Sequence, residues 1–375
     1  MKSFKSGTYI SQGTYKSFQP DFINRDWTIE NMELLNLLSK ADRNLGRLDM
    51  YSEYIPNIDM FISMHVLKEA TQSSKIEGTQ TNIEEALLDK EDVAKEKRND
   101  WEEVQNYIRA LNNAIESLNN IPFSSRLIRE THKVLLQGVR GKHKQPGEFR
   151  RSQNWIGGAS IRDAIFIPPE FNSINDLMSD IEKFAHNSES LLPELLKIAL
   201  IHYQFETIHP FLDGNGRVGR LLITLYLVNN GILKRPILYL SDFFERNRTL
   251  YYDNLMRVRE KHDIIQWFKF FLVGINETAE KGIDTFDKIL KLKQGIDSDI
   301  QTLGGRSVHA HKVMEYLYKR PVITPLAIAK ITELSIPTAY KLISDLENLG
   351  VLKEITGGKR KKMYIFSDYL GLFQG

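Results

Sequence analysis

The chain has 375 residues, of which 42% are hydrophobic and 26% are charged, and it contains no cysteine. At about 150 residues per domain this length predicts two or three domains, and the composition excludes collagen-like, coiled-coil and wholly disordered chains. The lack of cysteine excludes disulfides, thiolate zinc sites and a cysteine nucleophile, and it is typical of a reducing compartment. The net charge of +2 excludes a basic surface along the whole chain, but it divides into −3 over residues 1–305 and +5 over residues 306–375.

No stretch of the chain has the composition of a secretory signal or a membrane span. Residues 1–15 lack a continuous apolar segment. The longest apolar run, from Leu221 to Val228, is interrupted by Thr224 and is far shorter than the roughly 18 residues that a span needs. We therefore expect a cytoplasmic protein without a membrane partner.

Most of the chain has the periodicity of helices. Between residues 31 and 303 apolar residues recur at three- and four-residue spacing. The clearest segments are 59–76, 101–118, 125–137, 173–186 and 191–203. Residues 219–230 are apolar on nearly all faces and are followed by Gly231, which predicts a buried central helix. Residues 1–30 are polar and aromatic with scattered glycine and serine, and we expect an irregular arm there.

One segment of the helical region has the pattern of a β-hairpin. Residues 146–169 place Gly157 and Gly158 between two short apolar and aromatic runs, and the segment ends in Pro168 and Pro169. The fold that we expect for the body is therefore mainly α, an all-helical core with one small β-hairpin.

The tail of the chain changes character after the glycine pair at 304–305. Three helices are predicted at 309–319, 324–331 and 335–349, and two short strands at 351–355 and 363–366, joined by a glycine turn and a basic run. Three helices followed by a two-stranded basic wing are typical of a winged helix-turn-helix domain, which we place at 306–375.

The segment from His209 to Arg220 concentrates residues that bind phosphate. It reads His-Pro-Phe-Leu-Asp-Gly-Asn-Gly-Arg-Val-Gly-Arg. The consecutive residues Gly214 to Gly216 allow backbone N–H groups to converge on an anion, and the helix that follows points its positive end at the same place. Arg217 and Arg220 lie three apart on the first turn of that helix. Since no acidic partner is evident for them, we expect both to close on a polyphosphate.

Two further residues of this segment complete a reactive set. Asp213 supplies a hard oxygen ligand, which suits Mg²⁺ because that ion is often held by one or two carboxylates plus substrate phosphates. His209 lies four residues earlier and can take a proton from a nucleophile near pH 7. A base, a metal ligand, an anion-binding loop and two arginines are the components that transfer of a phosphorus-centred group requires.

Other interpretations of the segment stay open at this point. Its three glycines match the G-x-G-x-x-G pattern of a dinucleotide site, although a helix rather than a strand precedes them. His202, Glu206 and His209 could place three zinc ligands on one helical face, at a spacing that departs from H-E-x-x-H. A capped helix start with locally satisfied polar groups is the plainest alternative. A Walker A loop is excluded because no Gly-Lys-Ser/Thr ending is present.

The same twelve residues match the Fic motif, H-P-F-x-[D/E]-G-N-G-R-x-x-R, at every defined position. The chain therefore resembles the Fic family, over a helical core from about residue 59 to residue 276. The resemblance implies transfer of AMP from Mg·ATP to a Ser, Thr or Tyr hydroxyl of a target protein, with release of pyrophosphate. The Doc branch, which transfers phosphate, departs from the G-N-G-R sequence that this chain keeps, so AMP transfer is favoured.

The resemblance also assigns roles to individual residues. It implies that His209 deprotonates the target hydroxyl, that Asp213 holds Mg²⁺, and that the backbone N–H groups of the loop hold phosphates between the two arginines. The ATP-binding residues that it implies are Glu77, His209, Gly214, Asn215, Gly216, Arg217, Val218, Gly219, Arg220, Tyr251 and Tyr252. The tyrosine pair matches an aromatic pair used against adenine, although such a pair also packs in helical cores.

A second match concerns regulation. Residues Ser73 to Gly78 fit the family's inhibitory pattern [S/T]-x-x-x-E-[G/N] and lie before the core, as in the class with an N-terminal inhibitory helix. On that resemblance, Glu77 would pair with Arg220 and draw it away from the γ-phosphate, which predicts low basal activity. A charge-assisted pair of about 1.5–3 kcal/mol would bias the site roughly ten- to a hundredfold. In some members this glutamate positions a water that removes AMP, so the reverse reaction is an alternative.

The predicted hairpin occupies the place of the family's flap. The resemblance implies that Trp155, Ile156 and Gly157 pair with an extended segment of the target by strand addition and so align its hydroxyl. We expect Trp155 to be exposed and to anchor that segment.

These observations predict four regions and several partners. The regions are an N-terminal arm with the inhibitory helix at 1–100, the Fic catalytic core at 101–276, a helical linker at 277–305 and the winged helix at 306–375. The expected partners are Mg·ATP, a target protein that can be the protein itself, a second copy in a homodimer, and DNA or a protein for the tail. The alternative function is a nucleotide-sensing, DNA-binding transcriptional regulator, although the third helix of the tail offers only Lys341 against Asp345 and Glu347.

Overall fold

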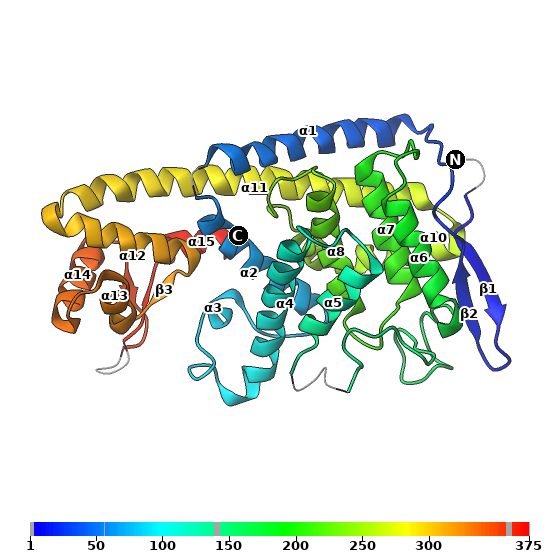
Figure 1. Ribbon diagram of the computed structural model, residues 1–375, viewed down its shortest axis with the longest axis horizontal. Helices are drawn as coiled ribbons and strands as arrows, with labels where there is room; N and C mark the ends of the chain where they lie inside the picture. Colours follow the sequence, from blue (N-terminus) through cyan, green and yellow to red (C-terminus); the bar gives the residue numbers. More distant parts are fainter. Residues whose placement is uncertain (1–3, 56, 139–142, 358–361, 375) are drawn as a thin grey trace.

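The computed structural model describes residues 4–55, 57–138, 143–357 and 362–374. Within these residues the chain is mainly helical, as predicted, with one small antiparallel sheet near each end of the chain (Figure 1). The helices up to the tail are α1 (Met32–Tyr54), α2 (Asp59–Ile76), α3 (Ile83–Ala86), α4 (Arg98–Ser117), α5 (Ser125–Leu135), α6 (Ile174–Ala185), α7 (Glu194–Ile208), α8 (Asn215–Asn229), α9 (Ser241–Arg246), α10 (Arg248–Lys261) and α11 (Ile264–Gln301). None of the helices in the described ranges is long and apolar enough to cross a membrane.

Helices α7 and α8 pack against each other at the centre of the body and are buried on nearly all faces. The predicted central helix is α8, but it begins at Asn215, four residues before the predicted start. The reason is Gly214, whose positive φ of 75° lets the chain turn directly into the helix. The loop between α7 and α8 is therefore short, and a buried helix fixes each of its ends.

The longest helix, α11, joins the body to the tail. It lies beside α1 along most of that helix's length (Figure 1), and the amide of Asn44 on α1 donates to Asn276 and Glu280 on α11 at 3.1 and 3.0 Å. The predicted boundary between core and linker, after residue 276, falls inside this continuous helix. The division into four regions stays a prediction.

The N-terminal arm is irregular only in part, because it contains a hairpin that the sequence did not predict. Strands β1 (Gly7–Ser11) and β2 (Lys16–Pro20) form an antiparallel hairpin in which Tyr9 lies opposite Phe18. The turn passes through Gly13 at a φ of 80°. Phe18 is fully buried, and its N–H donates to the carbonyl of Ile167 at 2.9 Å. Contact with the distant segment around Ile167 therefore stabilises β1 and β2, whose mostly polar sequences do not predict strands.

The predicted hairpin at 146–169 is reduced to a single β-bridge between Ile156 and Phe166. The turn is present, since Gly157 and Gly158 have φ values of 71° and 74°. A longer ladder does not form on this side, because Pro168 and Pro169 have no N–H to donate. We call residues 150–169 the flap segment.

The tail contains the three predicted helices, α12 (Ser307–Lys319), α13 (Pro325–Thr332) and α14 (Ile336–Asn348). The predicted wing strands are shorter than expected, β4 (Lys353–Glu354) and β5 (Tyr364–Ile365), and most of the basic run between them lies outside the described residues. A third strand, β3 (Val322–Ile323), completes a sheet of order β3-β5-β4, and helix α15 (Ser367–Gln374) ends the chain. The assignment of this tail to the winged-helix class stays a prediction.

Candidate active site

The loop between α7 and α8 brings the motif residues together. His209 ends α7 in the left-handed conformation, with φ 50° and ψ 61°. Asn215 braces the loop, because its side chain accepts from the N–H of Phe211 at 2.8 Å and donates to the carbonyl of Phe211 at 2.9 Å. Of the residues Gly214 to Gly216, Gly214 adopts the left-handed conformation, while Asn215 and Gly216 begin α8. The N–H groups that the sequence predicts to bind an anion therefore lie at the start of a helix.

His209 is held in its neutral form. Burial, together with the positive charges of Arg150 and Arg259, lowers the pKa of its imidazole to about 3. Its Nδ1 atom is buried and has no hydrogen-bond partner among the described residues. A neutral imidazole with an unused nitrogen is the form that can accept a proton.

Arg220 is buried and engaged by the C-terminal end of α2. Its guanidinium donates to Glu77 Oε1 at 2.7 Å, and to the hydroxyl and carbonyl of Ser73, both at 2.9 Å. Burial would raise the pKa of Glu77, but the charge of Arg220 outweighs it and the pKa is lowered. The contact requires glycine at 216, because a Cβ there would lie 2.2 Å from Glu77 Oε1. The predicted partners Ser73, Glu77 and Arg220 therefore meet.

Arg217 has acidic partners, contrary to our expectation for both arginines. Its Nη1 donates to Glu103 Oε2 at 3.1 Å, and its Nη2 lies 3.6 Å from Asp213 Oδ1. Glu103 lies on α4 and was missed because nothing in its local sequence distinguishes it from other surface glutamates. Both arginines of the motif are held by carboxylates that a bound anion would have to displace or share.

Asp213 lines a cavity of about 260 Å³ that lies beside the loop. The cavity is lined by Glu77, Gly78, Thr79, Asn99, Glu102, Glu103, Asn106, Leu135, Leu136, Gln137, Asp213 and Arg217. The side chain of Asp213 is 42% exposed, so a carboxylate oxygen can face a ligand there. An exposed carboxylate next to a helix N-terminus fits Mg²⁺, which takes its remaining ligands from water and phosphate.

The zinc alternative fails at His202. Its Nδ1 lies 2.8 Å from the carbonyl of Gly219 and its Nε2 lies 2.9 Å from the hydroxyl of Tyr251, so both ring nitrogens are engaged. The ring stacks on Phe244 and Trp267 in the core. Across the described ranges, no group of three or more His, Cys, Asp or Glu is placed to hold a metal.

The two tyrosines and the flap have different exposures. Tyr251 is buried in the core, whereas Tyr252 is 39% exposed, so only Tyr252 presents a ring that a base could stack on. Trp155 is 42% exposed, as expected of an anchor. Ile156 forms the bridge, and Gly157 has a positive φ of 71°, at which a side chain would strain the backbone. Val218 is fully buried and packs in the core.

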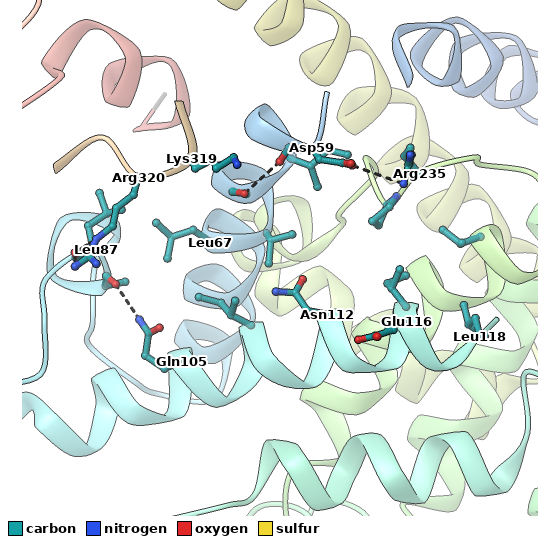
Figure 2. A pocket seen from close by; sticks show the side chains of 18 of the residues that line it. Asp59, Leu67, Leu87, Gln105, Asn112, Glu116, Leu118, Arg235, Lys319 and Arg320 are labelled. Atoms are coloured by element: carbon teal, nitrogen blue, oxygen red, sulfur yellow. Dashed lines mark hydrogen bonds and ion pairs between the residues drawn. The ribbon is translucent and has the colours of Figure 1, made fainter. Parts of the chain in front are cut away.

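A second and larger cavity, of about 950 Å³, lies away from the motif. Figure 2 shows Gln105, Asn112 and Glu116 pointing into it from α4, with Arg235 and Arg320 at its margins. None of the residues that line it belongs to the segment 209–220. It is therefore separate from the candidate active site.

The geometry is that of a helical protein in which a loop that begins at a histidine leads into the N-terminal end of a buried helix that carries two arginines. Residues 35–116 match the family model described as Fic/DOC family N-terminal, and residues 122–227 match the model described as Fic/DOC family. The chain belongs to the Fic/DOC family.

Similar curated proteins carry an activity in their names. The chain is 32% identical over 160 residues to protein adenylyltransferase Fic of Aedes aegypti, which covers 42% of this chain and 28% of that protein. It is 28% identical over 216 residues to a "probable protein adenylyltransferase" of Aquifex aeolicus, which covers 56% of this chain and 59% of that protein. The chain therefore matches less than two thirds of the length of each relative.

Solved structures share the fold. The crystal structure of a Fic family protein from Desulfovibrio desulfuricans superposes with a TM-score of 0.57 at 18% identity, and the match covers 91% of this chain and 98% of that chain. A Fic domain containing signaling protein from Bacteroides thetaiotaomicron has a TM-score of 0.52 at 18% identity, covering 67% of this chain and 95% of that chain.

Proposed function

We propose that the protein is an adenylyltransferase that transfers AMP from Mg·ATP to a Ser, Thr or Tyr hydroxyl of a target protein, which can be itself. The observation that carries the proposal is the short loop that joins neutral His209 to the N-terminal end of α8, which carries the buried side chains of Arg217 and Arg220. The family membership and the names of the similar proteins support the same reaction.

In the proposed reaction each residue has a defined task. His209 accepts the proton of the target hydroxyl, the oxygen forms a bond to the α-phosphorus of ATP, and the bond from that phosphorus to the pyrophosphate oxygen breaks. The N–H groups at the start of α8 and the side chains of Arg217 and Arg220 stabilise the charge on the phosphates. Asp213 would hold Mg²⁺, whose charge neutralises the leaving pyrophosphate. Tyr252 would stack on adenine.

We further propose that the contact between Glu77 and Arg220 inhibits the enzyme. Arg220 cannot reach a terminal phosphate while its guanidinium is bonded to Ser73 and Glu77. A charged hydrogen bond of this kind is worth about 1.5–3 kcal/mol, so its removal should raise transfer roughly ten- to a hundredfold.

The test uses the full-length protein and Glu77→Gly with ATP labelled at the α- or the γ-phosphate, incubated with a cell lysate. We expect protein-bound α-label, little γ-label, and a ten- to hundredfold rise in Glu77→Gly. Glu96→Gly, at an exposed position of the same region, is the matched control and should leave transfer at the wild-type level. His209→Ala should lose transfer and still bind ATP. Retention of γ-label alone, or no transfer by Glu77→Gly, would refute the proposal.

The position of Glu77 favours removal of AMP as a second candidate. Its carboxylate lies beside Gly216 at the first turn of α8, next to where the proposed reaction would take place, and it could orient a water there. Wild-type protein incubated with an AMP-modified target should then release AMP, whereas Glu77→Gly should not. Equal release by both proteins would argue against this role.

We propose that the tail is a winged helix, on the order of its elements from α12 through β5. Its third helix, α14, exposes Ile336 and Tyr340. Binding of the full-length protein to duplex DNA, measured at low and high salt, distinguishes the two uses of such a domain, because phosphate contacts weaken steeply with salt. Salt-insensitive or absent binding would favour a protein partner.

A further inference from the structure

Arg150 is a buried cation whose hydrogen-bond partners, among the residues that the structure describes, are all backbone carbonyls. Its side chain is 2% exposed. In the described part of the chain its guanidinium donates to the carbonyls of His209 at 3.0 Å, Ser152 at 3.0 Å, Pro169 at 2.6 Å and Ile208 at 3.4 Å. Its own backbone N–H donates to the carbonyl of Pro210 at 2.8 Å. Burying an arginine that is not paired with a carboxylate costs desolvation free energy, which its hydrogen bonds to carbonyls offset only in part. A residue with this cost is a candidate for a functional role.

These bonds fall into two groups that belong to different parts of the site. One group holds the carbonyls of Ile208 and His209, which belong to the two peptide units that flank His209, and the carbonyl of Pro210 in the next unit. The other group holds the carbonyls of Ser152 and Pro169, which lie at the two ends of the flap segment. Arg150 therefore connects the backbone of His209 directly to the base of the flap segment.

The backbone that Arg150 holds is the turn that ends α7. His209 has a positive φ of 50°, which is uncommon for a residue other than glycine. Arg150 donates to the carbonyls of the two peptide units that flank this residue. The flap residue Asn154 adds to the connection, since its amide donates to the carbonyls of Phe211 at 3.1 Å and His209 at 3.4 Å.

We propose that Arg150 is a positioning residue that keeps His209 and the flap segment in one fixed relative geometry, so that a hydroxyl aligned by the flap meets the imidazole. This inference rests on the proposed AMP transfer, in which the flap presents the target and His209 takes its proton. Arg150 touches neither ATP nor the hydroxyl in this arrangement. Its effect is on the distance and angle between base and hydroxyl, to which proton transfer is sensitive.

The charge of Arg150 has a second consequence for His209. The charged groups that act on this imidazole are Arg150 and Arg259, which favour its neutral form, and Glu77, which opposes them; burial has the largest effect. Arg259 is itself fixed by bonds to Thr207 Oγ1 at 3.2 Å and the carbonyl of Glu206 at 3.3 Å. Removal of the positive charge at 150 should therefore raise the pKa of His209, whereas a lysine there should not.

The test places Arg150→Lys and Arg150→Gln in the full-length Glu77→Gly protein. Lysine keeps the charge but cannot span the two groups of carbonyls, so we expect kcat for AMP transfer to fall by roughly ten- to a hundredfold, the cost of misplacing a reacting group by about 1 Å. The KM for ATP should change less than about twofold, since Arg150 does not contact α8. Arg151→Lys, at the exposed neighbouring position, is the matched control and should keep the kcat of the parent.

A second measurement does not depend on catalysis. Titration of the His209 ring followed by NMR should give a higher pKa in Arg150→Gln than in the parent, and an unchanged low pKa in Arg150→Lys. A kcat of Arg150→Lys equal to that of the parent would overturn the inference, as would equal losses in kcat and in ATP affinity. If Arg150→Gln does not fold, the kcat of Arg150→Lys decides. If the parent itself shows no AMP transfer, the proposed function fails, and the titration still decides whether Arg150 acts on His209.

Discussion

Glu206 lies one helical turn before His209 and is a buried carboxyl with an unsatisfied oxygen. Its Oε1 has no hydrogen-bond partner in the part of the chain that the structure describes. The carboxyl packs against α8 so closely that a Cβ at Gly219 would lie 2.2 Å from that oxygen. Burial raises the pKa of Glu206 to about 7, and the charges of Arg220 and Arg259 offset only part of this effect.

The raised pKa predicts that Glu206 makes stability depend on pH. In the unfolded chain a glutamate ionises near pH 4.3, so between about pH 4.3 and 7 the folded protein holds a proton that the unfolded chain has lost. Stability attributable to Glu206 therefore falls as pH rises through this window, by at most about 1.4 kcal/mol per pH unit, and is constant above it. Glu206→Gln should melt at a higher temperature than wild type at pH 8 and at the same temperature at pH 4.5.

The measurement is thermal unfolding followed by circular dichroism at both pH values. Glu260→Gln, at an exposed position, is the control and should show no such difference. A Glu206→Gln protein that is less stable than wild type at pH 8 would mean that the carboxylate is satisfied in the folded state.

At the level of residues, a sequence best predicts sites whose residues are contiguous in the chain. The segment from His209 to Arg220 could be assigned because all of its proposed functional residues lie within twelve positions. Glu103 and Arg150 could not, because they reach Arg217 and His209 from 114 and 59 residues away. The pattern of the segment gave no acidic partner for either arginine; the resemblance supplied Glu77 for Arg220, whereas Glu103, the partner of Arg217 on α4, was missed.

At the level of elements, the flap segment depends on a turn rather than on strands. Gly158 has a φ of 74°, and a Cβ there would lie 2.4 Å from the carbonyl oxygen of Asp163. Asp163 in turn accepts from the N–H groups of Ala159 and Ser160 at 2.8 and 2.9 Å. The tip of the flap is therefore a compact loop that a side chain at 158 would force open.

This geometry predicts separate effects on target and nucleotide. In the Glu77→Gly protein, Gly158→Ala should lower transfer to the target by roughly tenfold or more, because the flap no longer aligns the hydroxyl. The affinity for ATP should stay unchanged, since the flap tip does not contact α8. ATP affinity can be measured by calorimetry and transfer with α-labelled ATP.

The control for this prediction is Gly295→Ala in α11, where a Cβ meets nothing within 4 Å. That change should leave transfer unaltered and stabilise the helix slightly, by up to about 1 kcal/mol. Loss of ATP affinity together with transfer in Gly158→Ala would contradict a role confined to the target.

Elements that depend on tertiary contacts were the ones that sequence missed. The helices of the body are long and periodic, so their apolar spacing reveals them. Strands β1 and β2 are half-exposed and mostly polar, and become ordered where Phe18 packs against Phe166, with ring centroids 6.0 Å apart. Strand β3 has two residues, too few for any alternation to show.

At the level of the whole molecule, the tail packs on α2, the helix that carries Ser73 and ends next to Glu77. On one face of α2, Phe61 meets Tyr318 of α12 with ring centroids 5.2 Å apart, and His65 meets Phe373 of α15 at 5.0 Å. Further along the chain, Arg320 donates to the carbonyl of Leu87. Because α2 is one continuous helix, its packing against the tail and the position of Glu77 at its end are mechanically connected.

This connection predicts that the tail tightens inhibition. Phe373→Ala removes the ring that packs on His65, which should loosen α2 and weaken the contact between Glu77 and Arg220. We expect basal AMP transfer of the full-length protein to rise severalfold, toward but not beyond the level of Glu77→Gly. In the Glu77→Gly background the same change should have no further effect, because the contact that it weakens is already absent.

Tyr340→Ala, at an exposed aromatic position on the same tail, is the control and should leave transfer unchanged. Equal increases from Phe373→Ala with and without Glu77 would show that the tail acts on the site by another route.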